Sequence, residues 1–307
     1  MVQVQACGIC NSTDWKIIEG EFVSGTFPIL LGHESVGRVI RLGDQVRNFQ
    51  LGDLVLRSEL RDEHIPFPGG RSRWGGFVEK AIVTDAWAEK GVEYNAFPHR
   101  QQIVPRPIPA AHGAAMITLK ETLSCLDNSD VQPGHSLAIV GTGPVAQSLT
   151  LCAKLYGIQP LVVFGRRSVW VELFAKLGAD AYVVGDDLPT EVQAILARGG
   201  FDRAIEATGT RSALSRCLQV VKPDSKVNLY GVTPESEPHL PTEASDPRVF
   251  RSKMAEGETH DELLRWVDER KIQLADWISH EMHWTEYRRG FEMIRNKTAN
   301  KVVLTFS

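Results

Sequence analysis

The chain has 307 residues, 43% of them apolar and 23% charged, which is the composition of a globular protein long enough for about two domains. Its 34 basic and 38 acidic residues give a net charge of −4 without any lysine- and arginine-rich block, which argues against nucleic acid or an anionic membrane as a partner. No basic leader opens the chain and no segment approaches ~18 consecutive apolar residues, so we expect a cytoplasmic protein.

The motif GICNSTDWK, near the start of the chain, holds a cysteine, two hydroxyls and an aspartate. The five cysteines are an odd number and sparse, which favours reduced thiols or a metal ligand over a disulfide framework. Cys10, His33 and Glu34 offer the donor types that zinc prefers. In an extended strand His33 and Glu34 would point to opposite faces, so both reach one metal only if the chain turns between Gly32 and Gly37; otherwise Glu34 supports the ligands or binds transiently. A buried cysteine and a core histidine would explain the same residues without a metal.

Short β-rich runs alternate with glycine from Val36 to Val83, which predicts a strand-rich, barrel-like first region. Within it, Trp74 precedes two glycines and is expected to pack a turn. After about Ala114 the pattern becomes one of alternating helices and strands, with strands predicted at SLAIV, PLVVF, DAYVV, FDRAIEA and KVNLYGV. This alternation predicts an α/β fold with a doubly wound parallel sheet. An amphipathic helix is expected from Thr259, and a strand at KVVLTF.

The segment LAIVGTGPVAQ places Gly141, Gly143 and Ala146 in the pattern G-x-G-x-x-A, directly after a predicted strand. Glycines allow a tight turn there, so that a pyrophosphate can lie at the N-terminus of a helix formed by Pro144, Val145 and Ala146. A strand, a turn, a helix and a second strand follow in register. The segment therefore predicts a dinucleotide site rather than a plain strand-to-helix turn.

The end of the second strand indicates which dinucleotide is bound. NAD sites carry an acid there for the ribose 2′-hydroxyl, whereas this chain has Gly165, Arg166 and Arg167. Glycine leaves room for a 2′-phosphate, and two guanidiniums can bind it through charge-assisted hydrogen bonds. NADP(H) is therefore favoured over NAD(H). The alternative is a solvated pair of arginines in a loop.

Seven segments in matching order, GICNSTD, LLGHESVGRVIRLGDQVRNFQLGD, WGGFVEK, GTGPVAQ, AKLGAD, FDRAIEATGT and GFEMIRNKTANKVVLTF, resemble the zinc-dependent medium-chain alcohol and polyol dehydrogenases. The resemblance implies a GroES-like, β-rich catalytic domain over residues 1–117, a Rossmann NADP-binding domain over 118–255, and a return to the catalytic domain over 256–307. It also implies hydride transfer between NADP(H) and an alcohol or polyol, or its carbonyl counterpart, in a homodimer or homotetramer that acts on a small-molecule substrate.

The resemblance also implies roles for individual residues. Cys10 and His33 would bind one catalytic zinc, Glu34 would be a ligand or a near neighbour, and the hydroxyl of Ser12 or Thr13 would pass on the substrate proton. The zinc would act as a Lewis acid, as the known alcohol dehydrogenase example does. The residues expected to contact the coenzyme beyond the glycine turn and the arginines are Thr208, Gly209, Val232 and Lys301.

The chain departs from the family pattern in four ways. A further ligand is expected before the Rossmann glycines, but Ile117 or Thr118 falls there, which leaves Thr118, Glu121 or water as substitutes. The stretch CNSTD is one residue longer than the family pattern of Cys, any residue, Ser or Thr, and Asp. The four-cysteine structural zinc lobe is not expected, because no cysteine lies between Cys10 and Cys125. The catalytic domain also begins late, so we expect it to be short.

These departures leave two other interpretations open. One is a zinc-free reductase of the same superfamily, resembling quinone or enoyl reductases, because the further ligand is missing. The other is a non-catalytic NADPH-binding subunit, because the first motif is altered.

Overall fold

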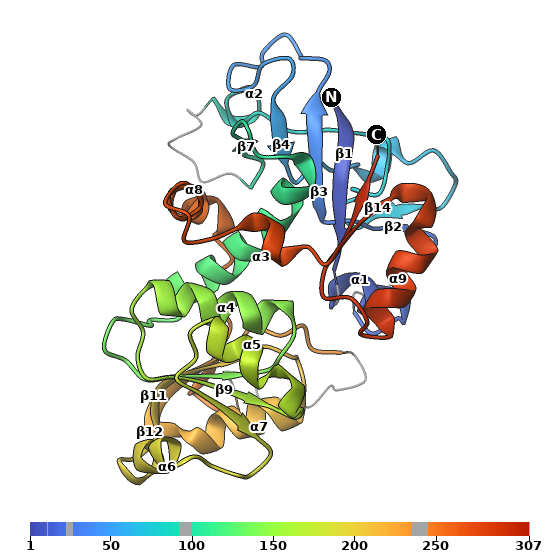
Figure 1. Cartoon of the computed structure of the whole chain (residues 1–307). Helices are drawn as coiled ribbons and strands as arrows, with labels where there is room; N and C mark the ends of the chain where they lie inside the picture. Colours follow the sequence, from blue (N-terminus) through green and yellow to red (C-terminus); the bar gives the residue numbers. More distant parts are fainter. Residues whose placement is uncertain (11, 23–26, 92–99, 235–244, 307) are drawn as a thin grey trace. The chain divides into compact units, whose positions relative to one another are not determined.

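The computed structural model describes residues 1–10, 12–22, 27–91, 100–234 and 245–306. They form two compact units, the first built from residues 1–120 and 255–307 and the second from residues 121–254. Figure 1 shows both, coloured along the sequence. The predicted α/β fold class is confirmed, because the first unit is built around a mainly antiparallel sheet and the second around a parallel sheet. No helix among the described residues is long and apolar enough to cross a membrane.

The first unit contains a sheet with the strand order β14-β15-β1-β3-β4-β7, and β6 also pairs with β1. Its strands are β1 (Val2–Ile9), β3 (Glu34–Val39), β4 (Leu54–Leu56), β6 (Lys80–Ala81), β7 (Ile103–Val104), β14 (His280–His283) and β15 (Val302–Thr305). A separate pair is formed by β2 (Ile29–Leu30) and β5 (Arg71–Ser72). Strand β1 lies between β3 and β15 and is antiparallel to both, so the last strand of the sequence pairs with the first.

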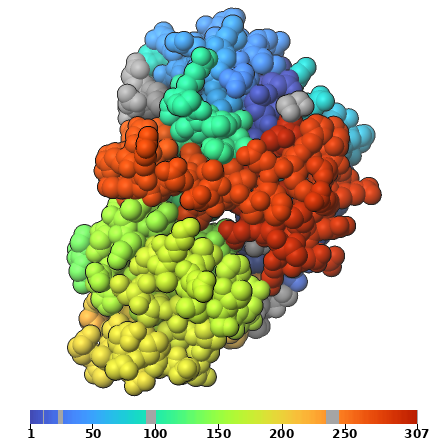
Figure 2. Space-filling view, viewed as in Figure 1, coloured from blue at the N-terminus to red at the C-terminus, as the bar shows by residue number. Residues whose placement is uncertain are grey.

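The first unit also contains helices. They are α1 (Thr13–Ile18), α2 (Ala86–Lys90), α8 (His260–Asp268) and α9 (Tyr287–Arg295), while α3 (Ala110–Asp127) continues into the second unit. Short 3-10 turns are η1 (Asp62–His64), η4 (Glu256–Thr259), η5 (Leu274–Trp277) and η6 (Trp284–Glu286). Helix α9 packs on β1 and β15 through a core that includes Ile9, Ile294 and Leu304. Figure 2 shows the C-terminal residues, in red, forming part of the surface of the first unit.

The second unit contains a parallel sheet with the strand order β10-β9-β8-β11-β12-β13. This is the order 3-2-1-4-5-6 of the dinucleotide-binding Rossmann fold. Its strands are β8 (Leu137–Val140), β9 (Leu161–Gly165), β10 (Ala181–Val184), β11 (Phe201–Glu206), β12 (Val221–Leu229) and β13 (Val249–Phe250). Its helices are α4 (Pro144–Leu155), α5 (Val171–Lys176), α6 (Thr190–Ala197) and α7 (Arg211–Val220), with the 3-10 turn η3 (Ser168–Trp170). The strands at SLAIV, PLVVF, DAYVV and FDRAIEA were predicted correctly.

Candidate metal and coenzyme sites

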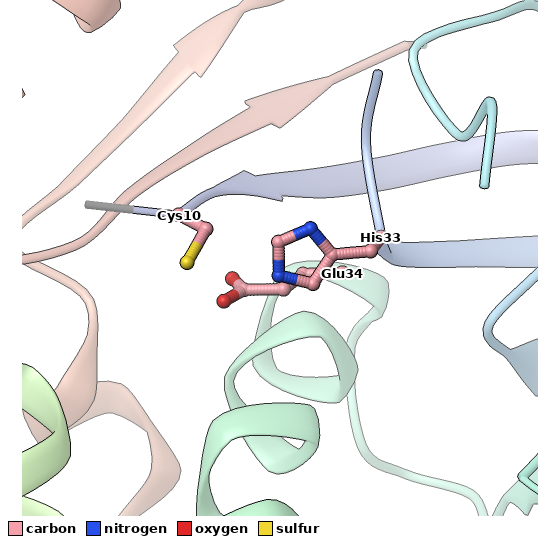
Figure 3. A group of neighbouring side chains, drawn as sticks. All are labelled: Cys10, His33 and Glu34. Carbon is pink, nitrogen blue, oxygen red and sulfur yellow. The ribbon is translucent and has the colours of Figure 1, made fainter. Parts of the chain in front are cut away.

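Cys10, His33 and Glu34 lie together in the first unit. Cys10 directly follows β1, Glu34 opens β3, and Gly8 of β1 lies opposite Glu34 in the sheet. One ligand atom of each residue lies within 4.8 Å of the others, and Figure 3 shows the thiol, the imidazole and the carboxylate facing one another. The sheet pairing therefore brings the thiol to residues more than twenty positions away in the sequence.

The turn needed for His33 and Glu34 to share one site is made at Gly32. Its φ of +103° lies in the left-handed region, where residues with a side chain are strained. A Cβ atom at Gly32 would also lie 2.6 Å from the backbone nitrogen of Phe77. Both the conformation and the close packing of the chain require glycine at this position, and the bend lets the two side chains converge.

Asp14 lies next to Cys10 and His33 and was not identified as a site residue from the sequence. It is fully buried in α1, its Oδ2 accepts a hydrogen bond from the backbone N–H of Cys10 at 2.9 Å, and its Oδ1 lies 3.4 Å from His33 Nδ1. Because Nδ1 faces Asp14, Nε2 is the ring nitrogen left for the thiol and Glu34. A carboxylate behind a histidine fixes the tautomer and orientation of metal-binding imidazoles. Its position one helical turn after Cys10 was the available sequence signal.

The charges around His33 act in opposite directions on its pKa. Burial lowers the pKa, but electrostatic interactions and hydrogen bonding with Cys10 and Asp14 outweigh burial and raise it well above its ordinary value. The ring of Trp74 packs against the imidazole with 4.9 Å between ring centroids. Cys10 and Asp14 thus favour the positively charged form of the His33 imidazole.

Glu34 is held by two residues that are distant in sequence. Lys301 Nζ donates to both oxygens of the Glu34 carboxylate, at 2.7 and 2.6 Å, and to Thr118 Oγ1 at 3.1 Å. The Thr118 hydroxyl donates to Glu34 Oε1 at 3.2 Å. Burial raises the pKa of Glu34, but the positive charges of Lys301 and His33 lower it overall. The carboxylate is therefore ionised, which is the form that binds a metal.

These contacts bear on the predicted roles of Lys301, Thr118 and Glu121. The ammonium of Lys301 pairs with Glu34 in the first unit, and its contact with the coenzyme pyrophosphate stays a prediction. Thr118 lies next to Glu34, as its place in the family pattern suggests. Among the described residues, the group of converging ligand atoms consists of Cys10, His33 and Glu34 and does not include Glu121.

Ser12 and Thr13 lie where α1 begins. Ser12 is the residue before the first turn, and the backbone N–H of Thr13 donates to Cys10 Sγ at 3.4 Å. In the family pattern the proton-carrying hydroxyl lies two residues after the cysteine and directly before the aspartate. Ser12 lies two residues after Cys10, whereas Thr13 lies directly before Asp14. The choice between these two hydroxyls stays a prediction.

The backbone of His33 is braced by a buried ion pair. Arg57 donates to both carboxylate oxygens of Glu256, from Nε at 3.0 Å and from one terminal nitrogen at 2.5 Å. Its other terminal nitrogen donates to the carbonyl of His33 at 2.6 Å. Arg57 adopts a φ of +60°, unusual for a residue with a side chain. The pair joins two segments separated by 199 positions and fixes the chain next to a proposed ligand.

The second unit carries the predicted glycine turn between β8 and α4. Gly141 has a φ of +142°, and a Cβ atom there would lie 3.1 Å from Thr208 Cγ2. Gly143 precedes Pro144, the first residue of α4, and, apart from its chain neighbours, no atom of the described residues lies within 4 Å of the position of its missing Cβ. No side chain caps this helix end among the described residues. The backbone N–H groups of Val145 and Ala146 are thus presented as in a pyrophosphate cradle.

Thr208, Gly209 and Val232 lie together at the end of β11. The buried carboxylate of Glu206 accepts hydrogen bonds from the N–H groups of Thr208, at 2.7 Å, and Gly209, at 2.9 Å. Burial raises the pKa of Glu206. Gly209 has a φ of +79°, and a Cβ there would overlap the carbonyl oxygen of Val232. Glu206, which the sequence reasoning did not single out, therefore shapes the loop assigned to the nicotinamide.

Arg166 and Arg167 follow β9 and are exposed, and Gly165 is the last residue of that strand. The guanidinium carbon of Arg167 lies 5.3 Å from the centroid of the Trp170 ring, within the range of a cation–π contact. Both arginines are thus accessible to an anionic ligand.

Two family models match the chain. The alcohol dehydrogenase GroES-like domain matches residues 1–91, and the zinc-binding dehydrogenase model matches residues 144–269, which together is more than two thirds of the chain. The chain belongs to the zinc-type alcohol dehydrogenases of the medium-chain family. It is an alcohol dehydrogenase-like oxidoreductase.

Relatives and solved structures agree with this assignment. The dehydrogenase is 24% identical over 324 residues to D-arabinitol dehydrogenase 1 of Uromyces fabae, with 99% of the chain and 89% of the relative covered. It is 28% identical over 336 residues to L-threonine 3-dehydrogenase of Pyrococcus horikoshii, covering 99% and 90%. A structure from Sinorhizobium meliloti 1021, described as a zinc-binding dehydrogenase bound to NADP, is 26% identical with a TM-score of 0.75, covering 99% and 91%.

A cavity of about 310 Å³ in the first unit of this dehydrogenase reaches His33. Trp74, expected to pack a turn, also lines this cavity and is the one large apolar side chain among its described lining residues. The remainder of the lining is polar or charged and includes Glu59, Arg61 and Gln101. The cavity therefore suits a small polar molecule better than an apolar one.

Proposed function

We propose that this dehydrogenase transfers a hydride between NADP(H) and a polyol, or its carbonyl counterpart, with one zinc at Cys10, His33 and Glu34. The observation that carries the proposal is the convergence of a thiol, an imidazole and an ionised carboxylate in the first unit. Three protein ligands and one open position are typical of catalytic zinc.

The residues present fit a zinc ion. Ligands around tetrahedral zinc lie about 3.5 Å apart, given bond lengths of about 2.0–2.3 Å, so the group within 4.8 Å needs only a small contraction. Asp14 supports His33 from behind, in the manner of carboxylate–histidine–zinc sites. Lys301 would have to release one oxygen of Glu34 or share the carboxylate with the metal. When bound, zinc would supply a Lewis acid for the substrate oxygen and NADP(H) would supply the hydride chemistry.

The other residues of the site orient His33 or carry the substrate proton. Asp14 Oδ1, 3.4 Å from His33 Nδ1, would orient the imidazole so that Nε2 is available, and the Arg57 guanidinium fixes the His33 carbonyl. Ser12 or Thr13, next to Cys10, would accept the substrate proton and pass it toward solvent. Mutation of each hydroxyl separately identifies the carrier, because only its loss should lower kcat and shift the pH profile of kcat.

The preference for NADP(H) rests on Gly165, Arg166 and Arg167. There is no acid at position 165 to repel a 2′-phosphate, and two exposed guanidiniums follow it. The NADP-bound structure from Sinorhizobium meliloti supports the same coenzyme. Replacing both arginines by alanine should abolish any preference for NADPH over NADH. Arg198→Ala, in an exposed arginine after α6, is the matched control and should leave the preference unchanged.

A polyol is favoured over an apolar alcohol because the cavity at His33 is mostly polar. The similarity to D-arabinitol dehydrogenase 1 supports this substrate class. Steady-state rates with a panel of polyols, sugars and alkyl alcohols test it: kcat/KM should be highest for polyhydroxylated compounds.

A zinc-free reductase is the second candidate, and one observation favours it. The Lys301 ammonium donates to both oxygens of Glu34, and in a zinc-free enzyme it would neutralise this carboxylate in place of a metal. The metal content of the purified protein separates the two candidates. About one zinc per chain, lost together with activity in Cys10→Ser but not in the control Cys125→Ser, supports the dehydrogenase. An active protein without metal supports the reductase, and NADPH binding without turnover supports a non-catalytic subunit.

A further inference from the structure

Gly165 stands where NAD-binding folds of this type carry an aspartate or glutamate. Its φ is outside the left-handed region, so the backbone conformation does not itself require glycine. A Cβ atom at this position, however, would overlap the hydroxyl of Tyr182 and lie 2.6 Å from its Cζ and 2.7 Å from Thr142 Cγ2. Neighbouring side chains, and not the backbone, therefore exclude a side chain at residue 165.

Tyr182 is held in this position from two sides. It lies on β10, the strand next to β9, and its ring stacks on Phe174 with 5.4 Å between centroids and an interplanar angle of 20°. Its hydroxyl donates a hydrogen bond to the carbonyl oxygen of Arg167 at 2.9 Å. Moving the ring to make room at residue 165 would break this hydrogen bond and disturb the stacking.

We propose that Tyr182 is a positioning residue that sets coenzyme choice. It fills the space that a side chain at residue 165 would need, and it holds the carbonyl of Arg167, so that the segment after β9 presents both guanidiniums. The inference rests on the proposed NADP(H) preference and adds that this preference cannot be reversed at residue 165 alone. An acid there can reach the ribose 2′-hydroxyl of NADH only after Tyr182 is made smaller.

Coenzyme binding to four proteins tests this proposal: the unchanged protein, Gly165→Asp, Tyr182→Ala and the double variant. NADPH and NADH are titrated separately into each protein by calorimetry. Gly165→Asp should weaken NADPH binding about tenfold or more without improving NADH binding, because the acid repels the phosphate but has no room to bind the ribose. The double variant should bind NADH about tenfold more tightly than Gly165→Asp does. Equal NADH affinity of these two variants would overturn the proposal.

A second measurement needs no coenzyme. Gly165→Ala should lower the thermal unfolding midpoint by a few degrees in the unchanged protein, because its Cβ has no room, and by clearly less in the Tyr182→Ala background, where only the contact with Thr142 Cγ2 remains. The matched control is Gly43→Ala, whose Cβ would meet Val46 Cγ2 at an ordinary contact distance of 3.8 Å and should leave the midpoint unchanged. The same loss in both Tyr182 backgrounds would contradict the steric argument.

Tyr182→Phe separates the two actions of the residue. It keeps the ring and its stacking but loses the hydrogen bond to Arg167, so NADPH binding should weaken severalfold while NADH binding stays the same. An unchanged NADPH affinity would remove the hydrogen bond from the proposal. If the unchanged protein binds both coenzymes equally, the proposed NADP(H) preference fails, while the gain of NADH binding in the double variant still decides the role of Tyr182.

Discussion

His260, at the start of α8, should make the stability of the first unit depend on pH. Its Nε2 lies 3.0 Å from the carbonyl oxygen of Ile103, and since a carbonyl only accepts, Nε2 carries the proton. Nδ1 is buried without a hydrogen-bond partner among the described residues. Burial and then the positive charge of Lys120 lower the pKa of His260 to about 3. The folded protein therefore keeps this imidazole neutral at pH values where the unfolded chain protonates it.

The sign and size of the effect follow from this difference in pKa. The unfolded chain binds a proton below about pH 6.5 and the folded chain only near pH 3, so the stability is complete above pH 6.5 and is lost as the pH falls toward 3. With about 1.4 kcal/mol per pKa unit, His260 should cost about 2 kcal/mol of unfolding free energy at pH 5. Domains are typically stable by only ~5–15 kcal/mol, so the loss is measurable.

Urea unfolding at pH 5, 6, 7 and 8 measures this dependence, and His260→Gln is the reference. Glutamine does not titrate and can still donate to the carbonyl of Ile103. The free energy of unfolding should fall between pH 7 and pH 5 by about 2 kcal/mol more in the unchanged protein than in the variant. Taking the difference removes the contribution of other titrating groups. The same pH dependence in both proteins would refute the argument.

Three further changes probe the metal site and its support. Glu256→Gln leaves Arg57 buried without its countercharge and should cost about 3–5 kcal/mol in urea unfolding, so a loss below 1 kcal/mol would contradict the bracing role. Asp14→Asn keeps the shape of the side chain but removes the charge next to the imidazole, and should weaken zinc binding about 10–100-fold in a chelator competition. An unchanged zinc affinity would show that Asp14 does not support metal binding. Gly32→Ala combines a left-handed φ with a close backbone contact and should cost about 2 kcal/mol or more, against almost nothing for Gly43→Ala.

The Rossmann unit could be predicted from the sequence because its signals are local. The glycines at 141 and 143 lie between an apolar run and an amphipathic segment, and that order is what the fold needs. Strand β1 was missed although its signal is also local: Val2, Val4 and Ala6 are buried while Gln3 and Gln5 are partly exposed. That two-residue period is the mark of a strand.

The metal site was predictable only in part. Cys10, His33 and Glu34 could be named from their chemistry, and the structure brings them together. Their supports could not be named, because Lys301 lies 267 positions from Glu34 and no local pattern records that contact. Asp14 is different: it lies within the first motif, and the one-residue insertion obscured its place in the family pattern.

The pairing of β15 with β1 has a consequence for the order of events during synthesis. Residues 121–254 form one continuous stretch and can fold as soon as they leave the ribosome. Lys301, which pairs with Glu34, is made roughly 15–50 s after Glu34 when synthesis proceeds at about 5–20 residues per second. During that interval the N-terminal ligands have neither their countercharge nor the neighbouring strand. Cys10, His33 and Glu34 are therefore all synthesised well before the ammonium group that competes with a metal for the Glu34 carboxylate.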